Sequence, residues 1–360
     1  MRILLFLFFI VLLVNAQTLA ELRELALSKG LQPIPSTYAD LLLMVDDIQN
    51  PMSVEKINLG KKLFFDKSLS KDKTLACVSC HDLKEGGEDA KPTAIGYNNL
   101  ENPSHLNSPT VLNTAFSKHL FWDGRASSLH VQAKGPMLAR FEMAATPELI
   151  EQRVQENPEY QELFRKSFSE NNPITFDNIA KALAVYEKTL VTRGALDAFL
   201  EGDDTALHVS AQRGLYLFIN LGCKGCHFGP AVGGESIQQF PLRDYNTFLH
   251  LTSTYDEVTN KREVTKIALN FKMYHPFPFD NIGGFMGKDG MKKFRVPILR
   301  NITKTAPYFH NGAIKTLREA ISVMGTYQIG VDLTPKQLDD MEAFLKSLDG
   351  EIVDYKLEVE

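Results

Sequence analysis

One five-residue pattern occurs twice in the chain, first at residues 77–81 (CVSCH) and again at residues 223–227 (CKGCH). C-x-x-C-H is the attachment pattern of c-type haem, in which two thiols form thioethers with the porphyrin and the adjoining histidine ligates the iron. The sequence therefore predicts two covalently bound c-type haems. The attachment residues are Cys77, Cys80, Cys223 and Cys226, and the histidine iron ligands are His81 and His227.

Two other uses of paired cysteines fit this pattern less well. A zinc site made of two C-x-x-C pairs usually spaces them by about 15 to 20 residues, whereas more than a hundred residues separate Cys80 from Cys223. A thioredoxin-like redox pair requires a βαβ context and does not require the following histidine. All four cysteines lie inside the two patterns, so none remains for a disulfide or a nucleophile.

The N-terminus predicts export. A short basic start at Arg2 is followed by an apolar run over residues 3–14 and by small residues that end at Ala16. The run is shorter than the ~20 residues that a membrane span needs, so residues 1–16 are predicted to be a cleaved signal peptide. An uncleaved membrane anchor is the alternative. Export also fits the cofactor, because c-type haem is generally attached outside the cytoplasm, and we expect the periplasm.

Length and periodicity predict a mainly α fold with two domains. The 360 residues exceed one typical domain, and the net charge of -5 argues against nucleic acid as a partner. Apolar residues at helical spacing predict helices over 18–29, 53–65, 126–134, 175–191, 206–221, 314–324 and 334–348, with a further helix start at Thr146-Pro147. Residues 76–109 and 228–297 are rich in turn formers and predict long loops.

The two patterns share a preceding context. Residues 60–65 (GKKLFF) and 214–218 (GLYLF) each end a predicted helix just before a C-x-x-C-H pattern. This repetition predicts two tandem cytochrome c-like haem domains joined at an interface. We place the first haem domain at residues 17–195 and the second at residues 196–360.

Several further stretches resemble the bacterial di-haem cytochrome c peroxidases, in the same order along the chain. They are residues 107–113 (NSPTVLN), 121–125 (FWDGR), 132–136 (QAKGP), 141–143 (FEM), 305–312 (TAPYFHNG) and 323–326 (VMGT). The set is specific, although each stretch alone would be weak. The resemblance covers almost all of the chain after the signal peptide.

The resemblance implies that the first domain carries the peroxidatic haem and that the second domain carries the electron-transfer haem. It also implies which residues act on peroxide. Glu142 matches the acid-base residue at the peroxidatic haem, where splitting an O–O bond requires a proton to move from one oxygen to the other. Gln132 matches a residue that orients peroxide without titrating. Without the resemblance, Glu142 would more often be a solvated surface acid.

The resemblance also implies the path of the electrons. Met324 matches the methionine that completes the second haem as a soft thioether ligand and raises its potential; the bland alternative is a methionine in the core. Trp122, the only tryptophan, matches the aromatic residue between the haems, and a core packing role is compatible with that position. Asn107, Thr305 and Pro307 match positions that hold a calcium ion through hard oxygen ligands.

One stretch departs from the resemblance. Many relatives have a histidine in an Ile-Gly-His loop that caps the peroxidatic iron in the resting enzyme, whereas this chain has Tyr97 there. Tyrosine ligates iron readily only as a phenolate, and its ordinary pKa is about 10. Tyr97 could ligate, His105 could substitute for it, or the iron could remain open. We expect an open or weakly capped iron.

The leading functional prediction is a periplasmic peroxidase that reduces hydrogen peroxide to water with electrons from a small cytochrome c or similar donor. The resemblance further implies a homodimer. Two alternatives stay open at this stage. One is a di-haem electron carrier without catalysis. The other is a di-haem enzyme that oxidises a protein side chain, a branch that uses tyrosine at the position of Met324.

Overall fold

The computed structural model describes residues 18–242, 251–256, 261–266 and 278–357. The predicted signal peptide lies outside the described residues. Helices dominate, and no helix among these residues combines the length and apolarity needed to cross a membrane. The prediction of a mainly α chain is confirmed.

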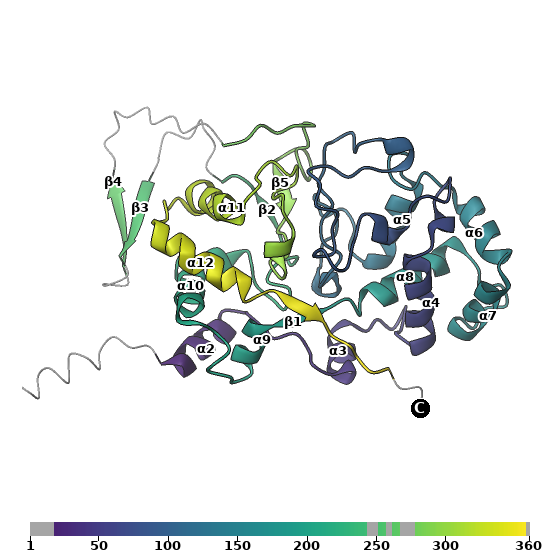
Figure 1. Cartoon of the computed structure of the whole chain (residues 1–360), viewed down its shortest axis with the longest axis horizontal. Helices are drawn as coiled ribbons and strands as arrows, with labels where there is room; N and C mark the ends of the chain where they lie inside the picture. The colour runs from purple at the N-terminus through teal and green to yellow at the C-terminus, as the bar shows by residue number, and fades with distance from the viewer. Residues whose placement is uncertain (1–17, 243–250, 257–260, 267–277, 358–360) are drawn as a thin grey trace, which may run out of the picture.

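Figure 1 labels the helices and strands along the chain. The helices are α2 (Leu19–Ser28), α3 (Tyr38–Val45), α4 (Val54–Phe64), α5 (Leu129–Leu138), α6 (Pro147–Gln155), α7 (Pro158–Ser167), α8 (Phe176–Glu187), α9 (Ala195–Leu200), α10 (Val209–Asn220), α11 (Leu317–Val323) and α12 (Pro335–Lys346). Three antiparallel two-stranded ribbons pair β1 (Thr192–Gly194) with β6 (Gly350–Ile352), β2 (Ile237–Gln239) with β5 (Lys293–Arg295), and β3 (Leu251–Asp256) with β4 (Lys261–Lys266).

A first hydrophobic core is formed by side chains of the five helices from α4 to α8 and of the segments between them, from Ile57 to Leu190. Its closest helix crossing is between α4 and α8, at Gly60. A Cβ atom built on Gly60 would lie 2.0 Å from the carbonyl oxygen of Ala182 and 2.7 Å from Cβ of Tyr186. The two backbones can approach this closely only because residue 60 has no side chain.

A second hydrophobic core repeats this arrangement with α10 and α12. Here the glycine is Gly214, whose added Cβ would lie 1.9 Å from the carbonyl oxygen of Asp340 and 2.7 Å from Cβ of Phe344. Gly60 and Gly214 are the residues at which the two preceding sequence contexts align. Each glycine therefore marks the helix crossing that comes before a C-x-x-C-H turn.

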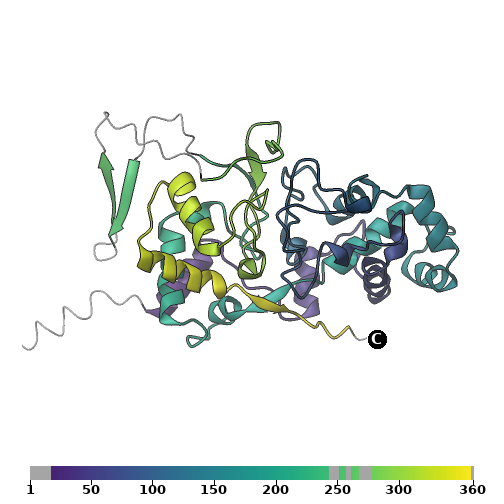
Figure 2. The same ribbon diagram turned by 45° about the horizontal axis from the view of Figure 1, so that its top comes forward.

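The segment near each end of the described chain packs with the core formed mainly by the other half of the chain. The cluster around α10 and α12 includes Leu22 and Ala26 of α2, whereas Leu357 near the C-terminus packs against the cluster of α4 to α8. Figures 1 and 2 show α4 to α8 grouped on one side and α2 with α9 to α12 on the other. The predicted division at residue 195 stays a prediction, and residues 19–31 pack with the second core.

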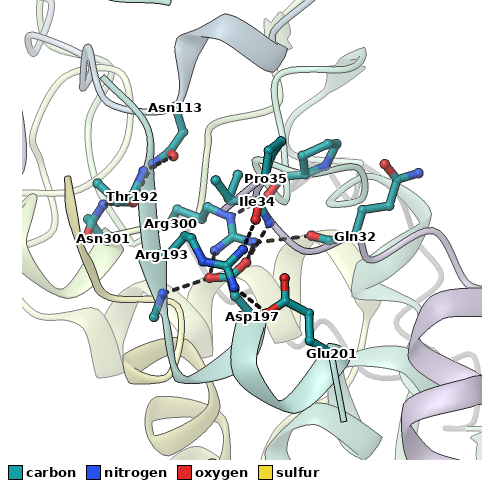
Figure 3. Close-up of polar contacts among 12 residues, drawn as sticks. Gln32, Ile34, Pro35, Asn113, Thr192, Arg193, Asp197, Glu201, Arg300 and Asn301 are labelled. Atoms are coloured by element: carbon teal, nitrogen blue, oxygen red, sulfur yellow. Dashed lines mark hydrogen bonds and ion pairs between the residues drawn. The ribbon is translucent and has the colours of Figure 1, made fainter. Parts of the chain in front are cut away.

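A buried ion pair joins three segments of the chain beside the second core (Figure 3). Arg300 donates through both terminal nitrogens to the carboxylate of Asp197, at 2.8 Å each, and both side chains are buried. Asp197 also accepts from the backbone N–H groups of Ile34 and Gly194, each at 2.8 Å. One carboxylate therefore connects three segments that are far apart in sequence.

Several helices differ from the sequence prediction. The helix predicted at 126–134 is α5, which begins after its Ser128 cap and continues to Leu138 with Pro136 inside. The helix predicted at 175–191 ends at Glu187, and the one at 314–324 forms α11 followed by a π-helical turn from Met324 to Ile329.

Short elements were missed altogether. Helices α3, α7 and α9 were not predicted, although Thr37 and Asn157 cap the first two as expected for helix starts. The region 228–297 was predicted to be mostly loop and contains the strands β2 to β5. Part of that region lies outside the described residues.

The glycine crossings generate a stability prediction. Replacing Gly60 or Gly214 by alanine forces a methyl group into a backbone carbonyl, so each variant should lose about 1–3 kcal/mol of unfolding free energy. Denaturant unfolding followed by circular dichroism measures this loss. Gln155→Ala is the control, because Gln155 is an exposed residue on α6 outside both crossings. Equal stability of all three variants would contradict the close crossing.

Candidate haem sites

The first C-x-x-C-H pattern folds as a short 3-10 turn at the edge of a large cavity. Cys77, Cys80 and His81 all line this space, which we call the first cavity. The Nδ1 atom of His81 lies 3.1 Å from the carbonyl oxygen of Gly87. Since a carbonyl can only accept, Nδ1 carries the proton and Nε2 remains as the metal-binding nitrogen.

The second pattern repeats this geometry in a second cavity lined by Cys223, Cys226 and His227. Nδ1 of His227 lies 3.3 Å from the carbonyl oxygen of Val232, and burial lowers the pKa of His227 to about 4. Met324 lines the same cavity from the π-helical turn that follows α11. The structure thus brings together the histidine and methionine predicted to ligate the second iron.

The residues present fit a c-type haem in both cavities. Each cavity holds two cysteines and one oriented histidine, and the remaining walls are mainly apolar, as a porphyrin requires. In the first cavity these walls include Leu106, Val111, Leu129, Met137 and Leu183. In the second they include Phe218, Ile298, Ile321, Val331 and Met341.

Glu142 and Gln132 both line the first cavity. Gln132 projects from α5, and Glu142 follows in the turn after that helix, where its N–H donates to the carbonyl of Ala139 at 2.9 Å. Burial raises the pKa of Glu142 to about 6, and the positive charge of Arg125 opposes this rise. A carboxyl group with a pKa in this range can take up and release a proton near neutral pH.

Neither predicted alternative ligand is among the described residues that line the first cavity. The ring of Tyr97 instead faces the ammonium group of Lys71, whose Nζ lies 5.1 Å from the ring centroid. The backbone N–H of Tyr97 donates to the carbonyl of Glu142 at 2.7 Å. His105 sits in a turn with a φ of 49° and also lies outside the lining.

Trp122 lies in the wall between the two cavities and lines both. Its indole Nε1–H donates to the carbonyl oxygen of Asn107 at 2.8 Å, and its side chain is buried. The ring of His310 is edge-on to it, with 6.4 Å between centroids. This position agrees with the bridging position that the resemblance implies, and it also makes Trp122 part of a packed wall.

The residues implied in calcium binding meet beside this wall. Asn107, Thr305 and Pro307 all line the second cavity. The side-chain nitrogen of Asn107 donates to the carbonyl of Lys91 at 2.7 Å, and Thr305 donates through its hydroxyl to Ile302. Amide and carbonyl oxygens of this kind suit a hard cation, and calcium remains a prediction.

Arg125, Glu187 and Arg295 are charged residues of the described cavity linings for which no role was predicted. Glu187 on α8 lines the first cavity, and burial raises its pKa to about 8. Its spacing of four residues from Leu183 on an apolar helix face was a usable signal. Arg295 lines both cavities and is almost fully buried. Its only signal was a basic residue between Phe294 and Val296 in an apolar run.

Comparison with known proteins agrees with this geometry. A family model described as di-haem cytochrome c peroxidase matches residues 54–205. The cytochrome c551 peroxidase of Pseudomonas aeruginosa is 37% identical over 328 residues, which are 89% of this chain and 84% of that protein. The cytochrome c551 peroxidase of Nitrosomonas europaea is 38% identical over 311 residues, which are 86% and 84% of the two chains.

A solved structure supports the same conclusion. The crystal structure of a MauG-like protein associated with microbial copper homeostasis has a TM-score of 0.68 and 25% identity, and the match covers 86% of this chain and 94% of that one. The fold and the two cavities define a protein with two c-type haems, of the peroxidase class. The chain belongs to the di-haem cytochrome c peroxidase family, and it is a haem-dependent oxidoreductase.

The two cavities generate a prediction about haem content. Changing both cysteines of one pattern to serine should remove one covalent haem and leave the other, because each cavity encloses its own attachment turn. Pyridine haemochrome spectra and the intact mass of Cys77→Ser/Cys80→Ser and Cys223→Ser/Cys226→Ser proteins measure this. Loss of both haems from one double variant, in a protein that still folds, would contradict separate attachment.

Proposed function

We propose that this enzyme is a periplasmic peroxidase that reduces hydrogen peroxide to water with electrons from a small cytochrome c or a similar donor. The observation that carries the proposal is the asymmetry of the two cavities. Met324 shares the second cavity with His227. The first cavity instead holds Glu142 and Gln132 with His81, and Tyr97 and His105 are not among its described lining residues.

The first cavity supplies the acid-base chemistry. When haem is bound, its iron provides the coordination site for peroxide and passes on the electrons. Glu142 would take a proton from one oxygen of peroxide and return it to the other oxygen, which then leaves as water. Gln132 donates and accepts hydrogen bonds and so orients peroxide without changing charge. Apolar walls exclude water that would compete for these groups.

The second cavity serves electron entry. His227 and Met324 would both ligate the iron of the haem held here, so no ligand position would remain for peroxide, and the thioether ligand would favour a high potential. Trp122, which lines both cavities, provides the aromatic contact between the two centres. Calcium at Asn107, Thr305 and Pro307 and a homodimer are parts of the same proposal.

The two alternative functions are separated by spectroscopy. An electron carrier without catalysis requires two permanently six-coordinate haems, so a high-spin ferric signal in electron paramagnetic resonance spectra argues for the peroxidase. An enzyme that oxidises a protein side chain would have tyrosine where this chain has Met324. Turnover of peroxide with a reduced cytochrome as the donor distinguishes that branch from the proposed function.

Glu142 generates a pH prediction. Because the carboxylate must accept the proton, the rate constant for reaction with peroxide should be low in acid and rise as pH increases through about 6, the raised pKa of Glu142. Glu142→Gln should lower this rate constant by about 10²–10⁴-fold and flatten the rise. Stopped-flow kinetics across pH measure both effects. Glu148→Gln is the control, since Glu148 is exposed on α6; an unchanged profile in Glu142→Gln would refute the role.

The position of Tyr97 generates a second prediction. Because its ring packs against Lys71 and not in the first cavity, the fully oxidised enzyme should react with peroxide without prior reduction. Tyr97→Phe should react at the same rate as the wild type. Mixing oxidised protein with peroxide in a stopped-flow instrument tests this. A reaction that begins only after one electron is added, or a clear rate change in Tyr97→Phe, would show that the iron is capped.

A further inference from the structure

Arg295 is a buried cation without an anionic partner in the part of the chain that the structure describes. It ends β5, and its backbone N–H donates to the carbonyl of Trp122 at 2.8 Å. Its side chain is 2% exposed. The guanidinium forms no ion pair with a described residue, and its buried Nε–H has no hydrogen-bond partner.

Arg300, five residues further along the same segment, shows what a buried guanidinium normally requires. It is fully buried as well, but Asp197 neutralises it with two hydrogen bonds, and carbonyl groups of Gln32 and Pro230 accept from its other N–H groups. A buried ion that lacks such partners is strongly destabilising. Arg295 therefore requires an anion that the described protein side chains do not supply.

The location of Arg295 limits where this anion can come from. Its side chain lines both cavities beside Trp122, with the guanidinium carbon 6.0 Å from the ring centroid. The first cavity contains two carboxyl groups, Glu142 and Glu187, and neither lies within ion-pair distance of Arg295. The second cavity has no acidic residue among its described lining. We therefore expect the anion to be part of the group that each cavity binds.

We propose that Arg295 is the shared counter-cation for the carboxylate side chains of the two haems. Each porphyrin carries two propionates, and a guanidinium presents five N–H donors in a planar fork that suits carboxylates. One cation in the common wall can therefore serve both centres. This inference rests on the proposed function in one respect, that both cavities hold haem.

A shared cation has a measurable electrostatic consequence. Reduction of a ferric haem lowers its net charge by one, so a nearby positive charge stabilises the reduced form and raises the midpoint potential. Loss of the charge of Arg295 should lower the potentials of both haems together. A cation that faces one cavity only should act on one haem only.

The test measures both midpoint potentials by spectroelectrochemistry in the holoenzyme and in Arg295→Gln, Arg295→Lys and Arg125→Gln. The control residue Arg125 lines the first cavity and not the second. We expect Arg295→Gln to shift both potentials downward, Arg295→Lys to restore at least part of each shift, and Arg125→Gln to leave the second haem unchanged. A glutamine variant with only one or neither potential shifted overturns the inference, as does a lysine variant as low as the glutamine variant.

Two further readouts keep the outcomes separate. If Arg295→Gln does not fold, the test uses the propionate bending bands in resonance Raman spectra of the Arg295→Lys protein. These bands should be shifted at both haems relative to the wild type. Unshifted bands overturn the inference. Pyridine haemochrome analysis of the wild type tests the premise. A wild type without two haems defeats the proposed function, whereas two haems with unmoved potentials in Arg295→Gln defeat only the role of Arg295.

Discussion

The buried pair of Asp197 and Arg300 is the interaction on which the arrangement of the two cavities depends. Both side chains are removed from water, and removing one partner of such a pair usually costs about 3–5 kcal/mol because the other charge is left uncompensated. The surrounding backbone satisfies the remaining capacity of both groups: Asp197 accepts from Ile34 and Gly194, and Arg300 donates to Gln32 and Pro230. The pair thus fixes the start of α9, the N-terminal segment and the loop after the second haem pattern in one place.

The wall between the cavities follows from that fixed point. Asn301, next to Arg300, donates to the hydroxyl of Thr192 at 2.7 Å, and the side chain of Asn113 donates to the same hydroxyl at 2.9 Å. Figure 3 shows this link beside the ion pair. The segment that carries Arg295 is therefore held against the segment that carries Asn107 and Trp122. A single set of buried polar contacts positions the groups that both cavities share.

Local chemistry determined which features could be predicted from sequence. The haem attachment turns, the helix before each turn and the capped helix starts at Thr146 and Thr334 depend on residues close together in the chain, so they could be predicted from the sequence. The resemblance supplied Glu142, Gln132 and Met324, and the structure places each in the expected cavity.

Features that depend on contacts between distant segments could not be predicted from the sequence. In the sequence, Arg295 is one basic residue among Lys292, Lys293 and Arg300. Only the folded chain shows that it is buried between two cavities with no anionic partner among the residues that the structure describes. Likewise, α3 and α9 are short, and α9 depends on the distant partner Arg300 of its residue Asp197. Tertiary contacts override local propensity at such positions.

The loop around Tyr97 contacts Glu142 through its backbone, while the side chain of Tyr97 points elsewhere. Gly96 packs directly against the turn that carries Glu142: an added Cβ would lie 2.1 Å from the carbonyl oxygen of Phe141 and 2.5 Å from Cα of Glu142. The next residue donates its backbone N–H to the carbonyl of Glu142. Both contacts are made by the backbone, so they do not depend on the identity of side chain 97. The loop can therefore support Glu142 while the tyrosine ring packs against Lys71. Under the proposed function, the position of the proton-transfer group and the access of peroxide would then depend on separate parts of the same loop.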